Sequence, residues 1–389
     1  MQTILVAHSR DGLGGSVITG ALLAKALDAG GEWKTLSVCN SPGPPLDYHR
    51  SIGVEVVPLM ESQGVHYKPN PTDGNRLRRI AKRILLFWAA RRFLKSASPA
   101  AIHVHDESSA LAWGLAARSR GIPLVWQVHQ QLPQRWVDWL LRRLAAHIVF
   151  VAANNRRRFG GVTLPPSSVI YNGVDLSQFY PAQVRANGPV TIGFISNLVD
   201  RKRPDWLVRA AGRLRRDGLD IKVVLAGNDF TGGDKAKELQ ALANEEGLGD
   251  RYAYIGPRSD VPDVLRSLDI LVLPSRRDKE AFPRIVVEAM ACGVPVVATE
   301  VAGIPEAVVH GQTGVLVDPD DFEAFVAALK ALASDAELRR QYGEAAAARC
   351  RALFSMEANA AAISHVYRDV VTSRQSHLDS FDGAAFGRR

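Results

Sequence analysis

The chain has 389 residues, 47% hydrophobic and 23% charged, which is typical of a soluble globular protein long enough for two domains with separate cores. It contains no run of eighteen apolar residues and no basic leader before its first strand pattern, so we expect neither a membrane-spanning helix nor a cleaved signal peptide. The net charge of +8 indicates a partner that carries phosphate, such as nucleic acid, anionic lipid or a nucleotide sugar.

The first element predicted is a strand followed by a helix. Thr3–Ala7 is a short apolar run, and Val17–Ala29 has helical spacing. The turn between them contains Gly12, Gly14 and Gly15, where the backbone can approach a phosphate or a sugar closely. These glycines lack the G-x-G-x-x-G spacing of a dinucleotide site, so by themselves they indicate little.

A basic amphipathic helix is predicted over residues 76–95. Its apolar positions recur at helical spacing, and it has no acidic residue among its cations, which are Arg76, Arg78, Arg79, Lys82, Arg83, Arg91, Arg92 and Lys95. Two interpretations stay open: the helix lies on an anionic membrane surface, or its apolar stripe packs on the sheet of the first domain. We expect no nucleic-acid binding, because no recognised module is present.

Two further strands of the first domain each end in polar residues. The strand over residues 101–105 ends at His105 and Asp106, and the strand over residues 124–128 is followed by His129. Ligands of open α/β sheets bind beyond the carboxyl ends of the strands, so these side chains are candidates for a site. His105 and Asp106 are candidates for the acceptor side, although a pair that caps a loop explains them equally well.

A second parallel, doubly wound domain follows a polar linker over residues 180–189. Strand patterns over residues 190–195, 221–226, 252–255 and 270–273 alternate with helical segments. We predict an N-terminal domain over residues 1–183 and a C-terminal domain over residues 190–355. A helix over about residues 356–372 is expected to cross back to the first domain, and residues 373–389 are expected to form a loose tail.

The stretch from Glu280 to Ala298 predicts a loop, a helix and a strand. Pro283 suits the first helical position, which places Phe282 to Ile285 at a helix N-terminus, where free amides and the helix dipole favour phosphate. Arg284 in the first turn opposes the dipole, and a bound diphosphate would reverse the sign of this effect. A solvent-facing arginine is the alternative.

A basic loop, residues 196–204, follows the first strand of the second domain. It contains Asn197 and three adjacent cations, Arg201, Lys202 and Arg203, which suit a diphosphate, although a solvated loop would also have this composition. Gly227 ends the next strand, and Arg258 follows the one after it, so both lie on the same expected edge.

The Glu280 to Ala298 stretch resembles the E-x7-E signature of the retaining glycosyltransferases of family 4, the "group 1" transferases. Residues 170–175 with Phe179 are similar to the N-G-V-D-x-x-x-F element of this family, and residues 303–306 with 311–317 are similar to its closing segment. His129 resembles the histidine of a T-x-H element, with Gln127 in place of the threonine. Lys202 matches the family lysine, whereas Asn197 stands where the family usually has arginine. The resemblance implies α/β architecture of the GT-B type, with two Rossmann-like, doubly wound parallel-sheet domains that face a cleft.

The resemblance also implies roles for individual residues. Glu280 would position donor-sugar hydroxyls, Glu288 would bind the ribose, and His129 and Lys202 would complete the catalytic set. The donor-binding residues implied are Gly14, Gly15, Asn197, Lys202, Gly227, Arg258, Phe282, Pro283, Arg284, Ile285 and Glu288. No Asp-x-Asp pair is placed to hold Mg²⁺, so we expect no metal and no cofactor, with the nucleotide sugar as substrate.

The predicted function is retaining transfer of a hexose from a UDP- or GDP-sugar to a glycan, lipid-linked or lipopolysaccharide-type acceptor. A GT-B epimerase or phosphorylase is the nearer alternative, and a non-catalytic module that binds anionic membrane or nucleic acid is the more distant one. The three widely spaced cysteines, Cys39, Cys292 and Cys350, fit a reducing compartment. We therefore expect a cytoplasmic protein, peripheral on the inner face of the cytoplasmic membrane if the basic helix lies on lipid.

Overall fold

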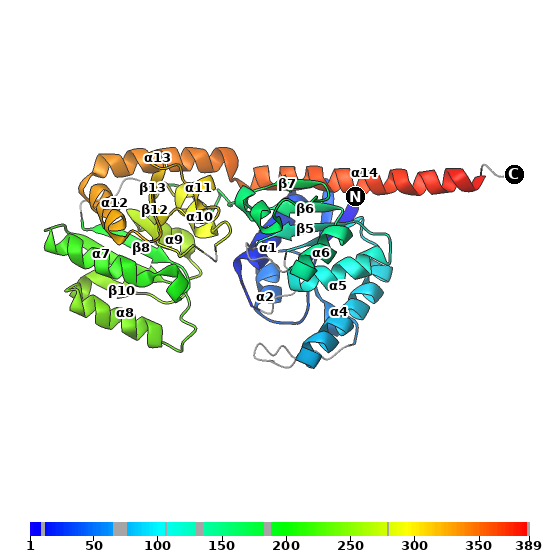
Figure 1. The fold of residues 1–389 in the computed structure, drawn as a ribbon, viewed down its shortest axis with the longest axis horizontal. Helices are drawn as coiled ribbons and strands as arrows, with labels where there is room; N and C mark the ends of the chain where they lie inside the picture. The colour runs from blue at the N-terminus through cyan, green and yellow to red at the C-terminus, as the bar shows by residue number, and fades with distance from the viewer. Residues whose placement is uncertain are drawn as a thin grey trace.

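A computed structural model describes residues 1–8, 12–64, 76–105, 107–129, 135–182, 188–277 and 280–386 (Figure 1). Two parallel sheets, each with helices on both faces, form two α/β domains. Strands buried on both faces consist of nearly continuous apolar residues, which is why these segments appear in the sequence as short apolar runs.

The first sheet has seven strands in the order β3-β2-β1-β4-β5-β6-β7, all parallel. Its order reverses direction between β1 and β4, so the carboxyl ends of these two strands form the switch point where such sheets bind ligands. The elements of this domain are β1 (Gln2–His8), α1 (Gly15–Ala29), β2 (Trp33–Cys39), α2 (Pro44–Ser51), β3 (Val56–Pro58), α3 (Leu59–Ser62), α4 (Arg76–Ala97), β4 (Ala101–Val104), α5 (Glu107–Arg118), β5 (Leu124–Val128), α6 (Arg135–Leu144), β6 (His147–Phe150), the 3₁₀ helix η1 (Ala153–Phe159) and β7 (Ser167–Val169).

The two faces of the first sheet are covered by different helices. Buried residues of α4, α5 and α6 pack on one face, and those of α1 and α14 pack on the other. The interpretation of residues 76–95 as a helix that packs on the first domain is confirmed for its inner side, where Leu86, Ala90 and Leu94 are buried, although α4 packs mainly on α5 rather than directly on the sheet.

The second sheet has six parallel strands in the order β10-β9-β8-β11-β12-β13. Its switch point lies between β8 and β11, so the loops that follow these two strands meet at one edge. The elements are β8 (Val190–Ile195), η2 (Asp200–Lys202), α7 (Pro204–Arg216), β9 (Ile221–Ala226), α8 (Asp234–Glu245), η3 (Gly249–Arg251), β10 (Tyr252–Tyr254), α9 (Val261–Arg266), β11 (Ile270–Leu273), α10 (Arg284–Ala291), β12 (Val296–Thr299), α11 (Ile304–Ala307), β13 (Gly314–Val317), α12 (Phe322–Ser334) and α13 (Ala336–Leu353).

The chain passes between the domains twice, and the two passages pair with each other. Val174 donates its N–H to the carbonyl of Phe354, and Met356 donates to the carbonyl of Val174. A side chain at Gly173 would lie 2.8 Å from the Cα of Met356, so a glycine is needed for this close approach. The two passages are therefore held side by side.

Helix α14 (Met356–Phe386) returns to the first domain, as predicted, and Figure 1 shows it following α13 along one side of both domains. The Trp33 indole donates to Ser364 Oγ at 2.6 Å, which fixes the helix against β2. The prediction of a loose tail from residue 373 is wrong up to residue 386, because α14 continues to Phe386. None of the helices in the described part of the chain is long and apolar enough to cross a membrane.

Candidate active site

The carboxylate of Glu280 lies at the switch point of the second sheet, where three donors surround it. It contacts the ammonium of Lys202, accepts from Ser275 Oγ at 3.0 Å and pairs with Arg201 at 3.2 Å. Lys202 and Arg201 follow β8, whereas Ser275 and Glu280 follow β11, so the strand order brings these residues together. The side chains of Lys202 and Glu280 are only 8% and 7% exposed.

The ion pair of Glu280 and Lys202 offsets the cost of burying a charge on either side chain. Burial lowers the pKa of Lys202, and the neighbouring Glu280 carboxylate opposes this shift. The ion pair thus holds the ammonium group of Lys202 at the carboxyl edge of the second sheet. An incoming anion would share this lysine with Glu280.

Helix α10 supplies a second buried ion pair, between Arg284 and Glu288. Their Nη2 and Oε1 atoms are 2.7 Å apart, and both side chains are largely buried. The solvent-facing alternative for Arg284 is therefore wrong. The helix begins at Arg284 with Pro283 as its N-cap residue, so the prediction of Pro283 at the first helical position is wrong by one residue.

The Arg284 guanidinium has unused capacity for a ligand. Its Nε is buried and has no hydrogen-bond partner within the described residues. A buried N–H without an acceptor costs about 1–3 kcal/mol, and such groups in native structures call for an explanation. A phosphate oxygen at this position would remove the cost.

The first domain contributes Tyr48 of α2 to the same region. Burial raises the pKa of the Tyr48 phenol, while the charge of Arg284 lowers it and the charges of Glu288 and Asp175 raise it. The Tyr48 phenol therefore responds to the charges of the α10 ion pair, although it belongs to the other domain. Tyr48 was not predicted because its surrounding sequence contains no recognisable motif.

The remaining donor-side candidates fall into two groups. Phe282 is buried and stacks on Tyr171 with ring centroids 5.1 Å apart, and Ile285 packs against the same core, so both side chains serve packing. Their backbone amides lie at the start of α10, as predicted for a phosphate-binding helix N-terminus, and their contact with a donor stays a prediction. Arg258 is exposed and forms an ion pair with Asp260 after β10.

Asn197 and Gly227 lie together at the ends of β8 and β9. The Asn228 amide donates to Asn197 Oδ1 at 3.4 Å. Gly227 has φ of +143°, and a side chain there would meet the carbonyl oxygen of Ser196 at 1.9 Å. Gly227 is thus required by backbone packing, whatever its role toward a ligand. In the first domain, Gly14 is the N-cap of α1, and a side chain at Gly15 would enter open space.

Histidines gather at the switch point of the first sheet. His105 Nδ1 lies 3.2 Å from His129 Nε2, and the His105 ring stacks on His103 with centroids 4.3 Å apart. His8 at the end of β1 also stacks on His105 and contacts His49 of α2. The structure therefore brings His105 and His129 together as expected at the strand ends, whereas Asp106 lies outside the described residues.

The buried histidines are held neutral. Burial lowers the pKa of His103 to about 3 and that of His105 well below its ordinary value, and the neighbouring histidines add to both effects. None of His8, His49 and His103 was predicted as a site residue. Strand spacing alone could not show that three strands and a helix bring them into one cluster.

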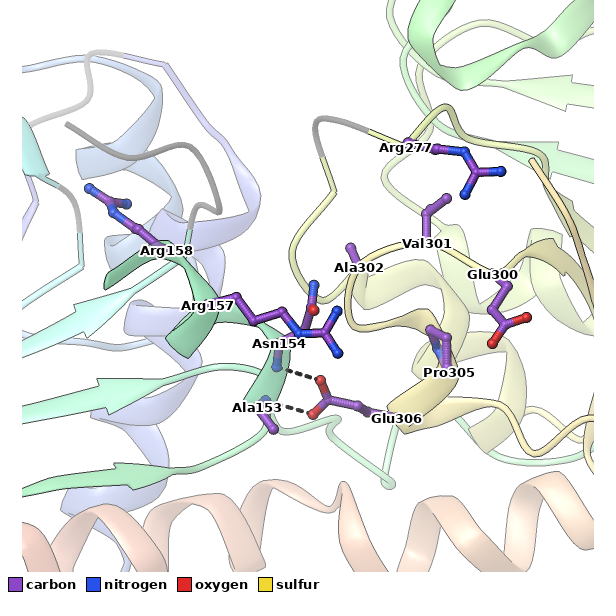
Figure 2. Close-up of a pocket in the computed structure, with 10 residues that line it drawn as sticks. All are labelled: Ala153, Asn154, Arg157, Arg158, Arg277, Glu300, Val301, Ala302, Pro305 and Glu306. Atoms are coloured by element: carbon purple, nitrogen blue, oxygen red, sulfur yellow. Dashed lines mark hydrogen bonds between the residues drawn. The ribbon is translucent and has the colours of Figure 1, made fainter. Parts of the chain in front are cut away.

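A hollow of about 780 Å³ lies between the domains (Figure 2). The Glu306 carboxylate crosses it and accepts from the backbone N–H groups of Ala153 and Asn154 at 2.6 and 2.8 Å, and Arg157 points toward the second domain (Figure 2). This carboxylate satisfies free amides at the start of η1, so it connects the two domains at this place. The sequence analysis included Glu306 in a motif but assigned it no role.

Two family models match adjoining parts of the chain. The model described as Glycosyltransferase Family 4 matches residues 13–178, and the model described as Glycosyl transferases group 1 matches residues 178–349. The lipopolysaccharide core biosynthesis mannosyltransferase LpcC of Rhizobium leguminosarum bv. viciae is 30% identical over 250 residues, which cover 62% of this chain and 69% of that protein. The chain belongs to the group 1 glycosyltransferases of family 4.

Other relatives of this glycosyltransferase are named D-inositol 3-phosphate glycosyltransferases. The protein from Corynebacterium jeikeium is 34% identical over 218 residues, 52% of this chain and 51% of the relative. The protein from Mycobacterium sp. (strain KMS) is 37% identical over 193 residues, 46% of this chain and 42% of the relative. The match thus spans about half the length of these relatives.

Solved structures agree in fold. HepE of Anabaena, in complex with UDP and glucose, superposes with a TM-score of 0.77 at 20% identity, over 94% of this chain and 99% of that one. Sucrose-phosphate synthase from Thermosynechococcus elongatus superposes with a TM-score of 0.79 at 22% identity, over 96% of this chain and 100% of that one. The prediction of GT-B architecture is confirmed, while the roles predicted for individual site residues stay predictions.

Proposed function

We propose that this glycosyltransferase moves a hexose from a UDP- or GDP-sugar to a hydroxyl of a glycan, lipid-linked or lipopolysaccharide-type acceptor, with retention of the anomeric configuration and without a metal ion. One observation carries the proposal. Two buried ion pairs, Lys202 with Glu280 and Arg284 with Glu288, lie in the loops after β8 and β11 and in helix α10, which begins at Arg284.

The cations serve the diphosphate of the donor. Lys202 and the unpartnered Nε of Arg284 offer positive charge and a donor, and the free amides at the start of α10 add further donors. Together they stabilise the negative charge that develops on the nucleotide as it departs. Such preorganised donors contribute most in a site that excludes water.

The two carboxylates hold different parts of the donor. Glu280 accepts hydrogen bonds from hydroxyls of the hexose, and Glu288 accepts from the ribose. Each carboxylate already has a cationic partner in the protein, which fixes its position. Neither carboxylate acts as a nucleophile in this scheme.

The transfer step breaks the bond between the anomeric carbon and the diphosphate oxygen and forms a bond from that carbon to the acceptor oxygen. The acceptor approaches on the face that the nucleotide leaves, and its hydroxyl proton passes to the departing phosphate oxygen. His129, held by His105, contacts the donor sugar from the first domain. Closure of the two domains would bring these groups onto one substrate and exclude water.

The names of related proteins support the classes of donor and acceptor. LpcC is named a lipopolysaccharide core mannosyltransferase, and HepE has been solved with UDP and glucose. Acceptors of the lipopolysaccharide or lipid-linked type are found at a membrane surface. We accordingly propose that the protein works in the cytoplasm, at the inner face of the cytoplasmic membrane.

The proposal is tested by incubating the purified protein with UDP-glucose, UDP-galactose, UDP-N-acetylglucosamine and GDP-mannose, with and without EDTA. Donor hydrolysis and a thermal shift are expected with at least one donor, in the presence of EDTA as well. Glu288→Gln should abolish both signals. Glu344→Gln, an exposed glutamate of α13 that pairs with Arg340, is the matched control and should leave them unchanged.

Three results would contradict the proposal. No donor binds or hydrolyses, or Glu288→Gln behaves like the control, or EDTA removes the activity. Product analysis by NMR gives the anomeric configuration and separates transfer from epimerisation, since an epimerase converts the donor sugar without an acceptor.

A further inference from the structure

Helices α4 and α6 expose large apolar side chains on the outer face of the first domain. Trp88 is 57% exposed, Trp136 is 60% exposed and Trp139 is 51% exposed. Ile80 and Ile84 of α4 are also exposed and continue the row toward the start of that helix, because positions four apart share one side of a helix. These five residues are called the tryptophan face below.

The tryptophan face borders an apolar groove of about 480 Å³. The groove runs between α4, α5 and α6 and is lined by Phe87, Leu111, Ala112 and Leu115 together with Ile80, Ile84, Arg83 and Trp136. Figure 1 shows these three helices together at one corner of the first domain, away from α14. An apolar surface of this kind on a protein in water marks a place of interaction.

Three arginines lie against the tryptophans of this face. The guanidinium of Arg143 lies 3.9 Å from the Trp139 ring centroid, that of Arg91 lies 5.7 Å from Trp88, and that of Arg83 lies 5.9 Å from Trp136. Further cations on these helices are Lys82, Arg92, Lys95, Arg118 and Arg142. Among the described side chains of α4, α5 and α6 the one acid is Asp138, which is buried against Arg158.

We propose that the tryptophan face docks the protein on the surface of a lipid bilayer that contains anionic lipids. Charge complementarity selects this partner, because three arginines lie against the tryptophans and five further cations belong to the same three helices, while the single described acid is already paired with Arg158. Tryptophan suits the boundary between headgroups and acyl chains, and arginine and lysine meet the headgroup phosphates. The groove provides room for the upper part of an acyl chain.

A nucleic acid would contact the cations but would leave the isoleucines and the groove in water. A bilayer covers both kinds of surface at once, as it does for an amphipathic interfacial helix. The docking proposal rests on the proposed function in one respect only, namely that the enzyme works at a membrane surface. Its test measures binding without sugar transfer, so the two proposals can fail separately.

The test uses the full chain with vesicles of phosphatidylcholine alone and of phosphatidylcholine mixed with phosphatidylglycerol. Sedimentation with vesicles should show binding to the anionic mixture that weakens as salt is raised. The double substitution Trp88→Ala with Trp136→Ala should lower the partition coefficient about tenfold or more, since two exposed indoles no longer enter the interface. Arg91→Gln should lower it about fivefold.

Matched controls lie on the second domain. Phe230 is 71% exposed after β9, and Arg351 is exposed on α13, so Phe230→Ala and Arg351→Gln should leave vesicle binding unchanged. Lipids brominated in the acyl chain should quench part of the tryptophan fluorescence of the wild type and less of the double variant. Circular dichroism verifies that each variant is folded.

Four outcomes would overturn the docking proposal. The protein fails to bind anionic vesicles at low salt, or the double variant binds as well as the Phe230→Ala control. Sedimentation velocity shows a dimer that only the double variant breaks, which would make the face an interface between copies of this chain. Finally, a short nucleic acid binds through the arginines while vesicles do not.

Discussion

Replacing Lys202 by methionine should both destabilise the second domain and weaken nucleotide binding. The ammonium contacts Glu280 while both side chains are less than a tenth exposed. Loss of one partner from a buried ion pair costs about 3–5 kcal/mol, because the other charge stays buried without it. Ser275 and Arg201 still bind the carboxylate, so we expect the lower end, about 3 kcal/mol.

The assay is urea unfolding of the wild type, Lys202→Met, Glu280→Gln and the double variant. The double variant should lose less than the sum of the single losses, by about 1–3 kcal/mol, since the two side chains interact directly. The affinity for UDP or GDP, measured by calorimetry, should fall about 10–100-fold in Lys202→Met, as expected for a lost hydrogen bond to a charged group.

Lys330→Met provides the control, because Lys330 pairs with Asp217 at 2.6 Å while both side chains are half exposed. It should cost less than about 1 kcal/mol and leave nucleotide affinity unchanged. The reasoning is refuted if Lys202→Met is as mild as Lys330→Met, if the two losses at Lys202 and Glu280 add, or if nucleotide affinity does not change.

Three further predictions concern other parts of the structure. Burial lowers the pKa of His103 to about 3, so the unfolded chain binds a proton at this histidine at a higher pH than the folded protein does. The free energy of unfolding should therefore fall as the pH drops below the ordinary histidine pKa of about 6.5. Between about pH 7.5 and about pH 5, urea unfolding should show the wild type losing about 2 kcal/mol more than His103→Asn, and equal losses would contradict this. Gly227→Ala should cost at least about 2 kcal/mol, visible as a lower melting temperature, because its side chain would meet a backbone carbonyl; Gly218→Ala, also at positive φ but with nothing within 4 Å, should cost clearly less. Glu306→Gln should raise hydrogen exchange of the first two amides of η1 about 10–100-fold, because they lose a charged acceptor from the other domain, and unchanged exchange would disprove this connection.

The sequence predicted the fold class because the signals for it are local. A strand buried on both faces is a short apolar run, and its alternation with helical spacing implies a parallel sheet. The strand that became β1 and the four predicted in the second domain all lie within one or two residues of their expected places. The end of α14 was missed because residues 373–386 lack an apolar period, and their helix continues from the packed part of α14.

The candidate site was predicted in part. The motifs marked Glu280, Glu288, Lys202 and Arg284 as residues of one site, yet they could not show which carboxylate pairs with which cation. From the sequence, Arg284 could either face solvent or bind a diphosphate; the structure excludes the first and adds an ion pair with Glu288 that the sequence did not reveal. Side-chain pairing depends on distances of a few ångströms between elements, which spacing along the chain does not contain.

The sequence by itself determined the alternation of strands and helices, the two-domain organisation and the set of charged residues at the loop before α10. Only the tertiary structure decided that β8 lies beside β11, so that Lys202 meets Glu280, and that β1 lies beside β4, so that His8 meets His105. The physical reason is that strand order is set by how helices cover both faces of each sheet, a property of the whole domain. Burial then shifts the pKa values of residues that look ordinary in the sequence, such as His103 and Tyr48.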